Sequence, residues 1–150
     1  MSNTVQLLVG SMLGATEYVA DHAADLLQQA GYSTEIVIDF NQWRPRDDES
    51  QRWLICTSTH GAGDLPDNIQ PLAEYLLMHR PNLASVKYGV IGLGDSSYDT
   101  FCEGSKTLDT VLEDLGAYKV AERLEIDVQE TPIPEDAAEA WLPQFIEKIA

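Results

Sequence analysis

Short apolar runs alternate with amphipathic segments along the chain, and this alternation restricts its fold more than any other feature of the sequence. The runs have the length of buried β-strands, and between them apolar residues recur at the three- and four-residue spacing of one helix face. Repeated strand–helix units form a parallel sheet with helices on both faces, because their crossovers are right-handed. We expect strands at 5–10, 34–38, 53–57 and 88–93, a weaker fifth strand at 120–128, and helices at 15–30, at 67–78, around 108–115 and around 138–149.

Capping residues and prolines refine the limits of two of these helices. Asp67 or Asn68 is expected to cap the second helix, because the side-chain oxygen of such a residue accepts a free amide of the first turn. Pro71 fits that first turn, where its missing N–H matters least. Pro143 lies inside the last helix and is expected to kink it or delay its start.

The length of 150 residues suits a single domain over residues 1–150, with a core large enough to fold without disulfides or metals. Cys56 and Cys102 form no C-x-x-C motif and no metal-ligand spacing, so a reducing cytoplasm fits best. The N-terminus lacks the basic region of a signal peptide, and no apolar run approaches the ~20 residues of a membrane span. We therefore expect a cytoplasmic protein.

The charge of the chain is strongly negative. Its 25 acidic residues outnumber 9 basic ones, which gives a net charge of −16 with neutral histidines. This charge argues strongly against a nucleic-acid backbone or an anionic membrane as the main partner. It favours a basic protein partner, although solubility alone explains the same charge.

Three polar, glycine-containing loops follow the first, third and fourth expected strands, at 11–16, 58–66 and 94–102. Ligands of open parallel sheets bind outside the carboxyl ends of the strands, near the point where the strand order switches. The three loops are therefore expected to meet at one edge of the sheet and to form the binding site there.

The first loop runs from Gly10 into a helix and has the chemistry of a phosphate site without basic side chains. Its small residues let backbone amides converge, the helix N-terminus adds partial positive charge, and Ser11 and Thr16 add hydroxyl donors. The loop does not fit the G-x-G-x-x-G dinucleotide motif. It is not a Walker A loop either, because no lysine follows Gly14.

The second and third loops each offer glycines for close backbone approach and one ring that can lie on a planar ligand. These rings are His60 and Tyr98. Phosphate binding at one loop and planar stacking at the two others predict a flat, mononucleotide-like cofactor.

These loops resemble those of the short-chain flavodoxins, and in particular the compact MioC/YqcA-like subgroup. The run from Ser11 to Thr16 is similar to the family's phosphate loop T-x-T-G-x-T, with Leu13 in place of a hydroxyl residue. The run from Thr59 to Asp64 resembles the loop over the inner flavin face, with His60 where an aromatic residue is usual. The resemblance covers the whole chain, and its most specific match is Gly94-Asp95-Ser96-Ser97-Tyr98 followed by Phe101-Cys102.

The resemblance implies a flavodoxin-like, doubly wound α/β sheet of five parallel strands in the order 2-1-3-4-5, with helices on both faces. It also implies bound FMN and one-electron chemistry, with no substrate chemistry and no catalytic residue of the chain's own. Gly61 would occupy the position whose carbonyl turns toward flavin N5, and Tyr98 would stack on the outer face of the ring. The residues carried over as FMN-binding are Ser11, Met12, Leu13, Gly14, Ala15, Thr16, Ser58, Thr59, His60, Gly61, Ala62, Gly63, Leu93, Gly94, Asp95, Tyr98, Phe101 and Cys102.

The function that follows is that of an electron carrier with a low reduction potential. A negatively charged reduced flavin is disfavoured beside Tyr98, the acidic loop residues and the strongly negative protein, and no lysine or arginine lies in the three loops. The family implies an NAD(P)H-dependent reductase as electron donor, and the acidic charge favours one with a basic face. The acceptor would be a low-potential enzyme, with radical-SAM enzymes such as biotin synthase as a candidate class. Nucleic acids, membranes and metals are not expected.

Other functions share the expected topology. A phosphoacceptor receiver domain fits poorly, because Gly10-Ser11, Thr57-Ser58 and Asp127 stand where its acidic pair, its aspartate and its lysine belong. A flavin-dependent NAD(P)H or quinone reductase would oxidise NAD(P)H steadily. A cofactor-free adaptor, slightly favoured by Leu13, would fail to bind FMN. Whether Asp127 contacts the ribityl chain, a partner or neither stays open.

Overall fold

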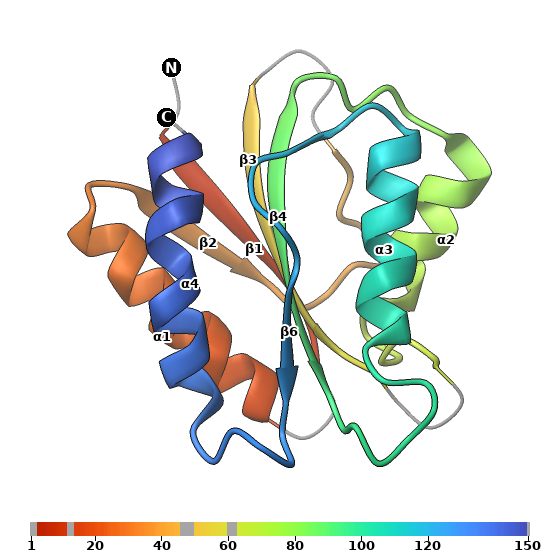
Figure 1. Cartoon of the computed structure of the whole chain (residues 1–150). Helices are drawn as coiled ribbons and strands as arrows, with labels where there is room; N and C mark the ends of the chain where they lie inside the picture. Colours follow the sequence, from red (N-terminus) through yellow and green to blue (C-terminus); the bar gives the residue numbers. More distant parts are fainter. Residues whose placement is uncertain (1–2, 12–13, 46–49, 60–62, 150) are drawn as a thin grey trace.

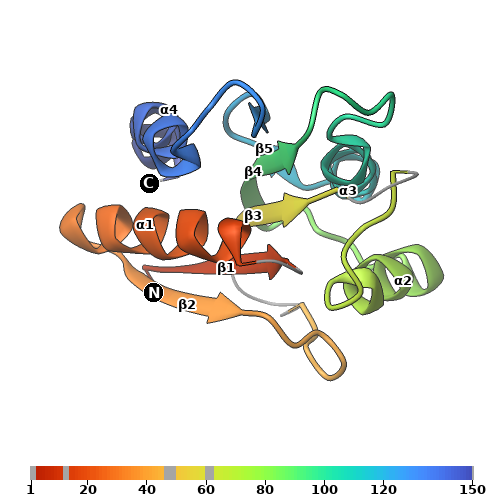
Figure 2. The same cartoon turned by 90° about the horizontal axis from the view of Figure 1, so that it is seen from below.

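A parallel β-sheet runs through the middle of the molecule, with two helices against each of its faces (Figure 1). The computed structural model describes residues 3–11, 14–45, 50–59 and 63–149. The strands are β1 (Thr4–Gly10), β2 (Ser33–Val37), β3 (Gln51–Ser58), β4 (Val86–Gly94), β5 (Tyr118–Lys119) and β6 (Leu124–Asp127). The helices are α1 (Ala15–Gln29), α2 (Gln70–His79), α3 (Glu103–Asp114) and α4 (Pro134–Lys148). Seen from below, α1 and α4 lie on one side of the sheet, and α2 and α3 on the other (Figure 2).

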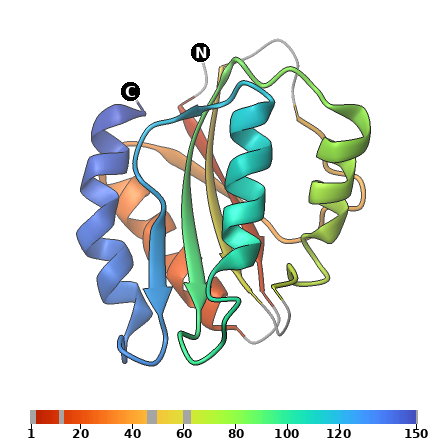
Figure 3. The ribbon, with the colours of Figure 1, turned by 45° about the vertical axis from the view of Figure 1, so that its right-hand side comes forward.

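The strand order is β2-β1-β3-β4-β5 with parallel pairing throughout, and β6 also pairs with β4. The flavodoxin-like order 2-1-3-4-5 predicted from the sequence is confirmed, with one difference at the fifth position. Two short strands replace the single strand expected at 120–128. β5 pairs with the start of β4, and β6 pairs with its end, where the blue arrow of β6 lies beside the green arrow of β4 (Figure 3). The prediction was wrong about where this strand begins and missed its break after Lys119.

Contacts of the segment between β5 and β6 account for this break. The indole N–H of Trp141 in α4 donates to the carbonyl of Glu122 at 2.9 Å. The guanidinium of Arg123 turns toward Asp109 in α3, with Nη1 at 2.5 Å from the carboxylate. Neighbouring residues of the segment therefore bind helices on opposite faces of the sheet. The hydrophobic pattern of the sequence gives no sign of either contact.

Apolar side chains cover both faces of the sheet, as a parallel sheet between two helix layers requires. Successive residues of β1 alternate between the two layers. Leu7 is buried in one cluster with Val19 of α1, and Leu8 in a second cluster with Leu72 of α2 and Leu108 of α3. This double core fixes the sheet and leaves the carboxyl ends of its strands to carry loops.

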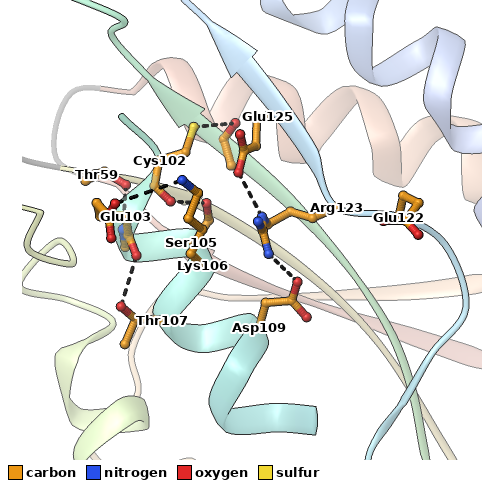
Figure 4. A network of polar contacts seen from close by, with 12 residues as sticks. Thr59, Cys102, Glu103, Ser105, Lys106, Thr107, Asp109, Glu122, Arg123 and Glu125 are labelled. Carbon is orange, nitrogen blue, oxygen red and sulfur yellow. Dashed lines mark hydrogen bonds and ion pairs between the residues drawn. The ribbon is translucent and has the colours of Figure 1, made fainter. Parts of the chain in front are cut away.

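A buried carboxylate, Asp109 of α3, is the centre of a polar network (Figure 4). It accepts a hydrogen bond from the Tyr88 hydroxyl at 2.6 Å and lies 2.5 Å from Arg123 and 3.4 Å from Lys119. Arg123 also binds Glu125 of β6 at 3.0 Å. Burial and the bond to Asp109 raise the pKa of Tyr88, so its hydroxyl stays a donor. The network fastens both short strands to α3.

The start of α2 differs from the expected one. The helix begins at Gln70, and neither Asp67 nor Asn68 provides a side-chain cap. The Asn68 side chain instead bonds to three backbone groups near the end of β1 and β2. The expected place of Pro71 in the first turn is confirmed.

The last helix continues through its internal proline. Pro143 is exposed, and α4 runs unbroken from Pro134 to Lys148, which corrects the expected delay of its start. A proline has no N–H to donate to the carbonyl four residues before it in a helix. When the proline is on the solvent side, that carbonyl lies near water, which lowers the cost of the lost hydrogen bond. Among the helices that the structure describes, none is long and apolar enough to cross a membrane.

We expect Asp109→Ala to lower the free energy of unfolding by about 3 kcal/mol, because it leaves the Tyr88 hydroxyl and two cations without their buried carboxylate. Glu113→Ala is the matched control. Glu113 binds Lys119 at 2.7 Å, but its side chain is 49% exposed, so its loss should cost less than about 1 kcal/mol. Urea unfolding of both variants measures the difference. Equal losses would contradict the central place of Asp109.

Candidate functional site

Two adjoining cavities lie at the edge of the sheet where the carboxyl ends of β1, β3 and β4 meet, the lower edge in Figure 1. Both are lined by Thr59, Gly94 and Asp95. The larger, of about 200 Å³, is also lined by Ser11, Ala15, Thr16, Ser58, Leu93 and Val128. The smaller, of about 150 Å³, is also lined by Tyr98, Thr100, Phe101 and Cys102. The structure thus brings residues from all three predicted loops to one place.

The start of α1 supplies hydrogen-bond donors to the larger cavity. The helix follows Gly14, whose φ of 84° is in the left-handed region that glycine adopts readily. Tyr18 N–H makes the first bond of the helix, to the Gly14 carbonyl, so the amides of the first turn have no helical acceptor. These amides and the partial positive charge of the helix end suit an anion. Of the predicted residues, Met12 and Leu13 lie outside the described residues.

The loop after β3 is held at both of its ends. Thr59 N–H donates to the Leu93 carbonyl at 3.2 Å, and its hydroxyl oxygen accepts from Gly104 N–H at 3.0 Å. Further along, the Gln70 side chain donates to the Leu65 carbonyl at 2.9 Å. The loop is therefore tied to β4, α3 and α2. His60, Gly61 and Ala62, predicted to contact a flat ring, lie outside the described residues, and Gly63 has a φ of 95°.

The loop after β4 packs closely on its own strand. A Cβ atom at Gly94 would lie 2.9 Å from the backbone nitrogen and 2.9 Å from the sulfur of Cys102, so a side chain there would push the loop away. Tyr98 N–H donates to the Asp95 carbonyl at 3.1 Å, which closes a turn. The Tyr98 side chain is 58% exposed at the mouth of the smaller cavity. Its ring is available to cover a planar ligand.

The Cys102 thiol is buried beside the smaller cavity and uncharged (Figure 4). It lies 3.7 Å from the Gly92 carbonyl. Burial, and next the negative charge of Glu125, raise its pKa to about 12. A neutral thiol there adds no charge to the site, and its thiolate is not available as a nucleophile near neutral pH.

Asp127, whose role the sequence left open, holds the loop after β4. Its carboxylate accepts from Ser96 N–H at 3.1 Å and from Gln129 N–H at 2.9 Å. The Gln129 side chain donates to Asp95 at 2.9 Å. Hydrogen bonds lower the pKa of Asp127, first that from Ser96, and lower that of Asp95, first those from Ser97 and Gln129. Both carboxylates therefore stay charged and join the loop after β4 to the residues that follow β6.

Sequence reasoning missed two residues that shape the site. Val128 follows β6 and lines the larger cavity, and Asn68 bonds to Ser11 N–H at 3.0 Å. The signal for Val128 was its place at the carboxyl end of the expected fifth strand, at the edge where ligands of such sheets bind. No local signal identifies Asn68, because its partners lie 30 to 59 residues away.

Comparison with known proteins agrees with this geometry. A family model described as flavodoxin matches residues 7–141. Protein MioC of Escherichia coli K12 is 42% identical over 142 residues, 95% of both chains, and flavodoxin YqcA of the same strain is 40% identical over 146 residues, 94% of this chain and 95% of its own. The solved structure of a cysteine-to-alanine mutant of flavodoxin from Pseudomonas aeruginosa has a TM-score of 0.85 and 38% identity, covering 97% of this chain and 98% of that one.

The chain belongs to the flavodoxin family, and the resemblance to its MioC/YqcA-like members predicted from the loops is confirmed. Members of this family are carriers of electrons. The binding groups that this chain places at the edge of its sheet are consistent with that class of protein.

We expect Asp127→Ala to speed hydrogen exchange of the Ser96 and Gln129 amides at pH 7 by at least about ten-fold, because both lose their acceptor. Asp127→Asn keeps an acceptor oxygen and should have a smaller effect. The lowered pKa of Asp127 sets the sign of the pH dependence. The protection it gives is complete above the ordinary aspartate pKa of about 3.9 and is lost only as pH falls through the lowered pKa of Asp127 in the folded protein. Exchange rates insensitive to both changes would contradict this role.

Proposed function

We propose that this chain binds FMN in the two adjoining cavities and carries single electrons. The observation that supports this most is the placement of two different kinds of binding group side by side. Uncharged donors at the start of α1 face the larger cavity, and the exposed Tyr98 ring stands at the mouth of the smaller one. FMN has a phosphate at one end and a flat ring at the other, so it matches both.

The donor set of the larger cavity fits a phosphate ester. Ser11 and Thr16 contribute hydroxyls and Ala15 a first-turn amide, and the described residues lining the cavity include no lysine or arginine. A helix N-terminus binds phosphate without cationic side chains. Ser11 to Thr16 would hold the phosphate of FMN, as the family resemblance implies.

The remaining lining residues suit a flat ring. Gly94 lacks a Cβ, so the ring can approach the backbone after β4 closely, and Tyr98 would cover its outer face. Thr59 would lie toward the opposite face of the ring, in the same loop as His60 and Gly61. FMN supplies one-electron chemistry when bound, and the chain contributes the environment of the ring.

The electrostatic environment favours a low reduction potential. Four aspartates, which we call the acidic rim, lie in or next to the loops at this edge: Asp64, Asp67, Asp95 and Asp99. The pKa of Asp95 is lowered, so it carries its charge at neutral pH. With a net charge of −16, the protein disfavours any additional negative charge at the ring. We infer an electron carrier without substrate chemistry of its own. Steady NAD(P)H oxidation by the pure protein would instead indicate a reductase.

We expect the apoprotein to quench the fluorescence of one equivalent of FMN, and Tyr98→Ala to weaken FMN binding by about ten-fold, because stacking of a ring contributes roughly 1 kcal/mol beyond its buried area. The same variant should raise the potential of the second reduction step. Tyr118→Ala is the matched control, since Tyr118 is 65% exposed but pairs with the start of β4, at the other end of the sheet. Fluorescence titration measures both affinities. A colourless protein that leaves FMN fluorescence unchanged would favour the cofactor-free adaptor.

We further propose that the acidic rim docks an NAD(P)H-dependent reductase with a basic face in the cytoplasm, and that a low-potential enzyme accepts the electrons. Asp64, Asp67 and Asp99 are exposed, and they lie in the segments that follow β3 and β4 at the same edge of the sheet as the cavities. Complementary charge around an exposed cofactor edge accelerates encounter. Radical-SAM enzymes such as biotin synthase are one candidate class of acceptor.

The rate of electron transfer from such a reductase should fall as salt rises past ~0.15 M, because the screening length drops below ~8 Å. The double change Asp64→Asn and Asp67→Asn should lower the rate at low salt and flatten this dependence. Asp25→Asn on α1, an exposed aspartate outside the three loops, is the control. Stopped-flow mixing measures the rates. Rates indifferent to salt would remove the acidic rim from the proposal.

A further inference from the structure

The side chain of Asn68 joins three segments that are far apart in the sequence. Its amide nitrogen donates to the Val9 carbonyl of β1 at 2.7 Å and to the Ile38 carbonyl just after β2 at 3.0 Å. Its oxygen accepts from Ser11 N–H at 3.0 Å. Both donor hydrogens and the acceptor of this side chain are therefore engaged with backbone groups.

This position is the point where β1 and β2 separate. Their paired register ends at Leu8 and Val37, whereas β1 stays paired with β3 as far as Gly10. Beyond that point the facing carbonyls of Val9 and Ile38 need other donors. The Asn68 amide supplies both hydrogen bonds, so one side chain closes the gap between β1 and β2. This gap borders the switch in strand order between β1 and β3, where ligands of such sheets bind.

The neighbour of Asn68 fixes the same segment by packing. Ile69 is fully buried, and a Cβ atom at Gly10 would lie only 2.7 Å from its Cγ2 atom. The backbone of β1 thus passes directly against Ile69 as it leads into the first loop. Packing at Ile69 and hydrogen bonds at Asn68 together fix the backbone from Val9 to Ser11, where β1 leads into the first loop.

A chain of hydrogen bonds leads from Asn68 to the start of α1. Asn68 holds Ser11 N–H, and the Ser11 hydroxyl oxygen accepts from Gly14 N–H at 3.2 Å. Gly14 immediately precedes the helix. The amides of Ser11 and Gly14 are thus engaged within the protein, so these two are not among the backbone amides available to a ligand. The donors left for a ligand are the Ser11 and Thr16 hydroxyls and the first-turn amides.

We propose that Asn68 is a positioning residue for phosphate recognition: it holds Ser11 and Gly14 so that the first turn of α1 faces the phosphate of FMN. The proposal rests on the proposed function and deepens it. Asn68 does not belong to the residues that line either cavity. Its effect is therefore exerted through the first loop and should be felt by the phosphate and not by the ring.

The test compares FMN with riboflavin, which has the same ring and no phosphate. We expect Asn68→Ala to weaken FMN binding by about 10- to 100-fold, the effect of losing hydrogen bonds worth about 1–3 kcal/mol. The affinity for riboflavin should change by less than about three-fold in the same variant. Asn68→Asp should be at least as harmful to FMN binding, because it removes both donated bonds and adds a negative charge close to the phosphate loop. Fluorescence titration of the apoproteins measures all affinities.

Asn82 provides the matched control. It is exposed between α2 and β4, and its side-chain oxygen accepts from Ala84 N–H at 3.0 Å. Asn82→Ala and Asn82→Asp make the same chemical changes at the opposite edge of the sheet, and both should leave both affinities unchanged. Equal weakening of FMN and riboflavin by Asn68→Ala, or no weakening of either, would overturn the proposal. Absence of FMN binding by the unaltered protein would instead refute the proposed function.

A second measurement needs no variant and decides the question if Asn68→Ala does not fold or riboflavin does not bind. Inorganic phosphate is titrated into the ¹⁵N-labelled apoprotein. We expect slow hydrogen exchange at Ser11 N–H, and saturable shifts of this amide and of the Asn68 side-chain amide as phosphate binds. A Ser11 amide that exchanges as fast as an exposed one, or that ignores phosphate while the α1 amides respond, would overturn the proposal.

Discussion

Parallel pairing of β1, β3 and β4 is the constraint on which the rest of the structure depends. Gly10 pairs with Thr57, Thr57 pairs with Gly92, and the adjoining pair is Ser58 with Leu93. The three strands therefore end level with one another, and three loops leave the sheet side by side. Side chains on the two faces of these strands pack into two different clusters, so a slip of the register by one residue would move each of them to the wrong face and disrupt both clusters. A binding site at this edge follows from the core itself.

Basic side chains take part in the buried network around Asp109, whereas the described lining of the larger cavity has none. Arg123 and Lys119, two of the 9 basic residues, bind the buried Asp109 and acidic neighbours on α3 and β6. Their charge is offset within the fold. The rim carries aspartates, and the described lining of the larger cavity offers hydroxyls and amides in place of cations. An anion can bind such neutral donors while the surrounding potential stays negative, which is the combination that a low-potential carrier requires.

The sequence predicted the first four strands and the four helices because each depends on local periodicity, and it placed the three loops because they follow apolar strands. It could not predict the break after Lys119, which depends on Trp141 and Arg123 reaching helices on opposite faces. It also mistook Asn68 for a helix cap. An asparagine before a helix is a capping signal by statistics, but the unpaired carbonyls at the end of β1 compete for the same side chain, and only tertiary structure brings them close.

The two cavities share Thr59, Gly94 and Asp95 in their lining, but different contacts hold the proposed phosphate end and the proposed ring end of the site, and this has a consequence for binding. The phosphate side is fixed through Asn68 and Ser11 to β1 and β2. The ring side is fixed through Thr59 to α3 and through Asp127 to β6. Contacts that share no partner contribute nearly additively to free energy. Affinity for the phosphate can therefore vary without changing the surroundings of the ring, so tight retention of a cofactor and the tuning of its potential need not oppose each other in this fold.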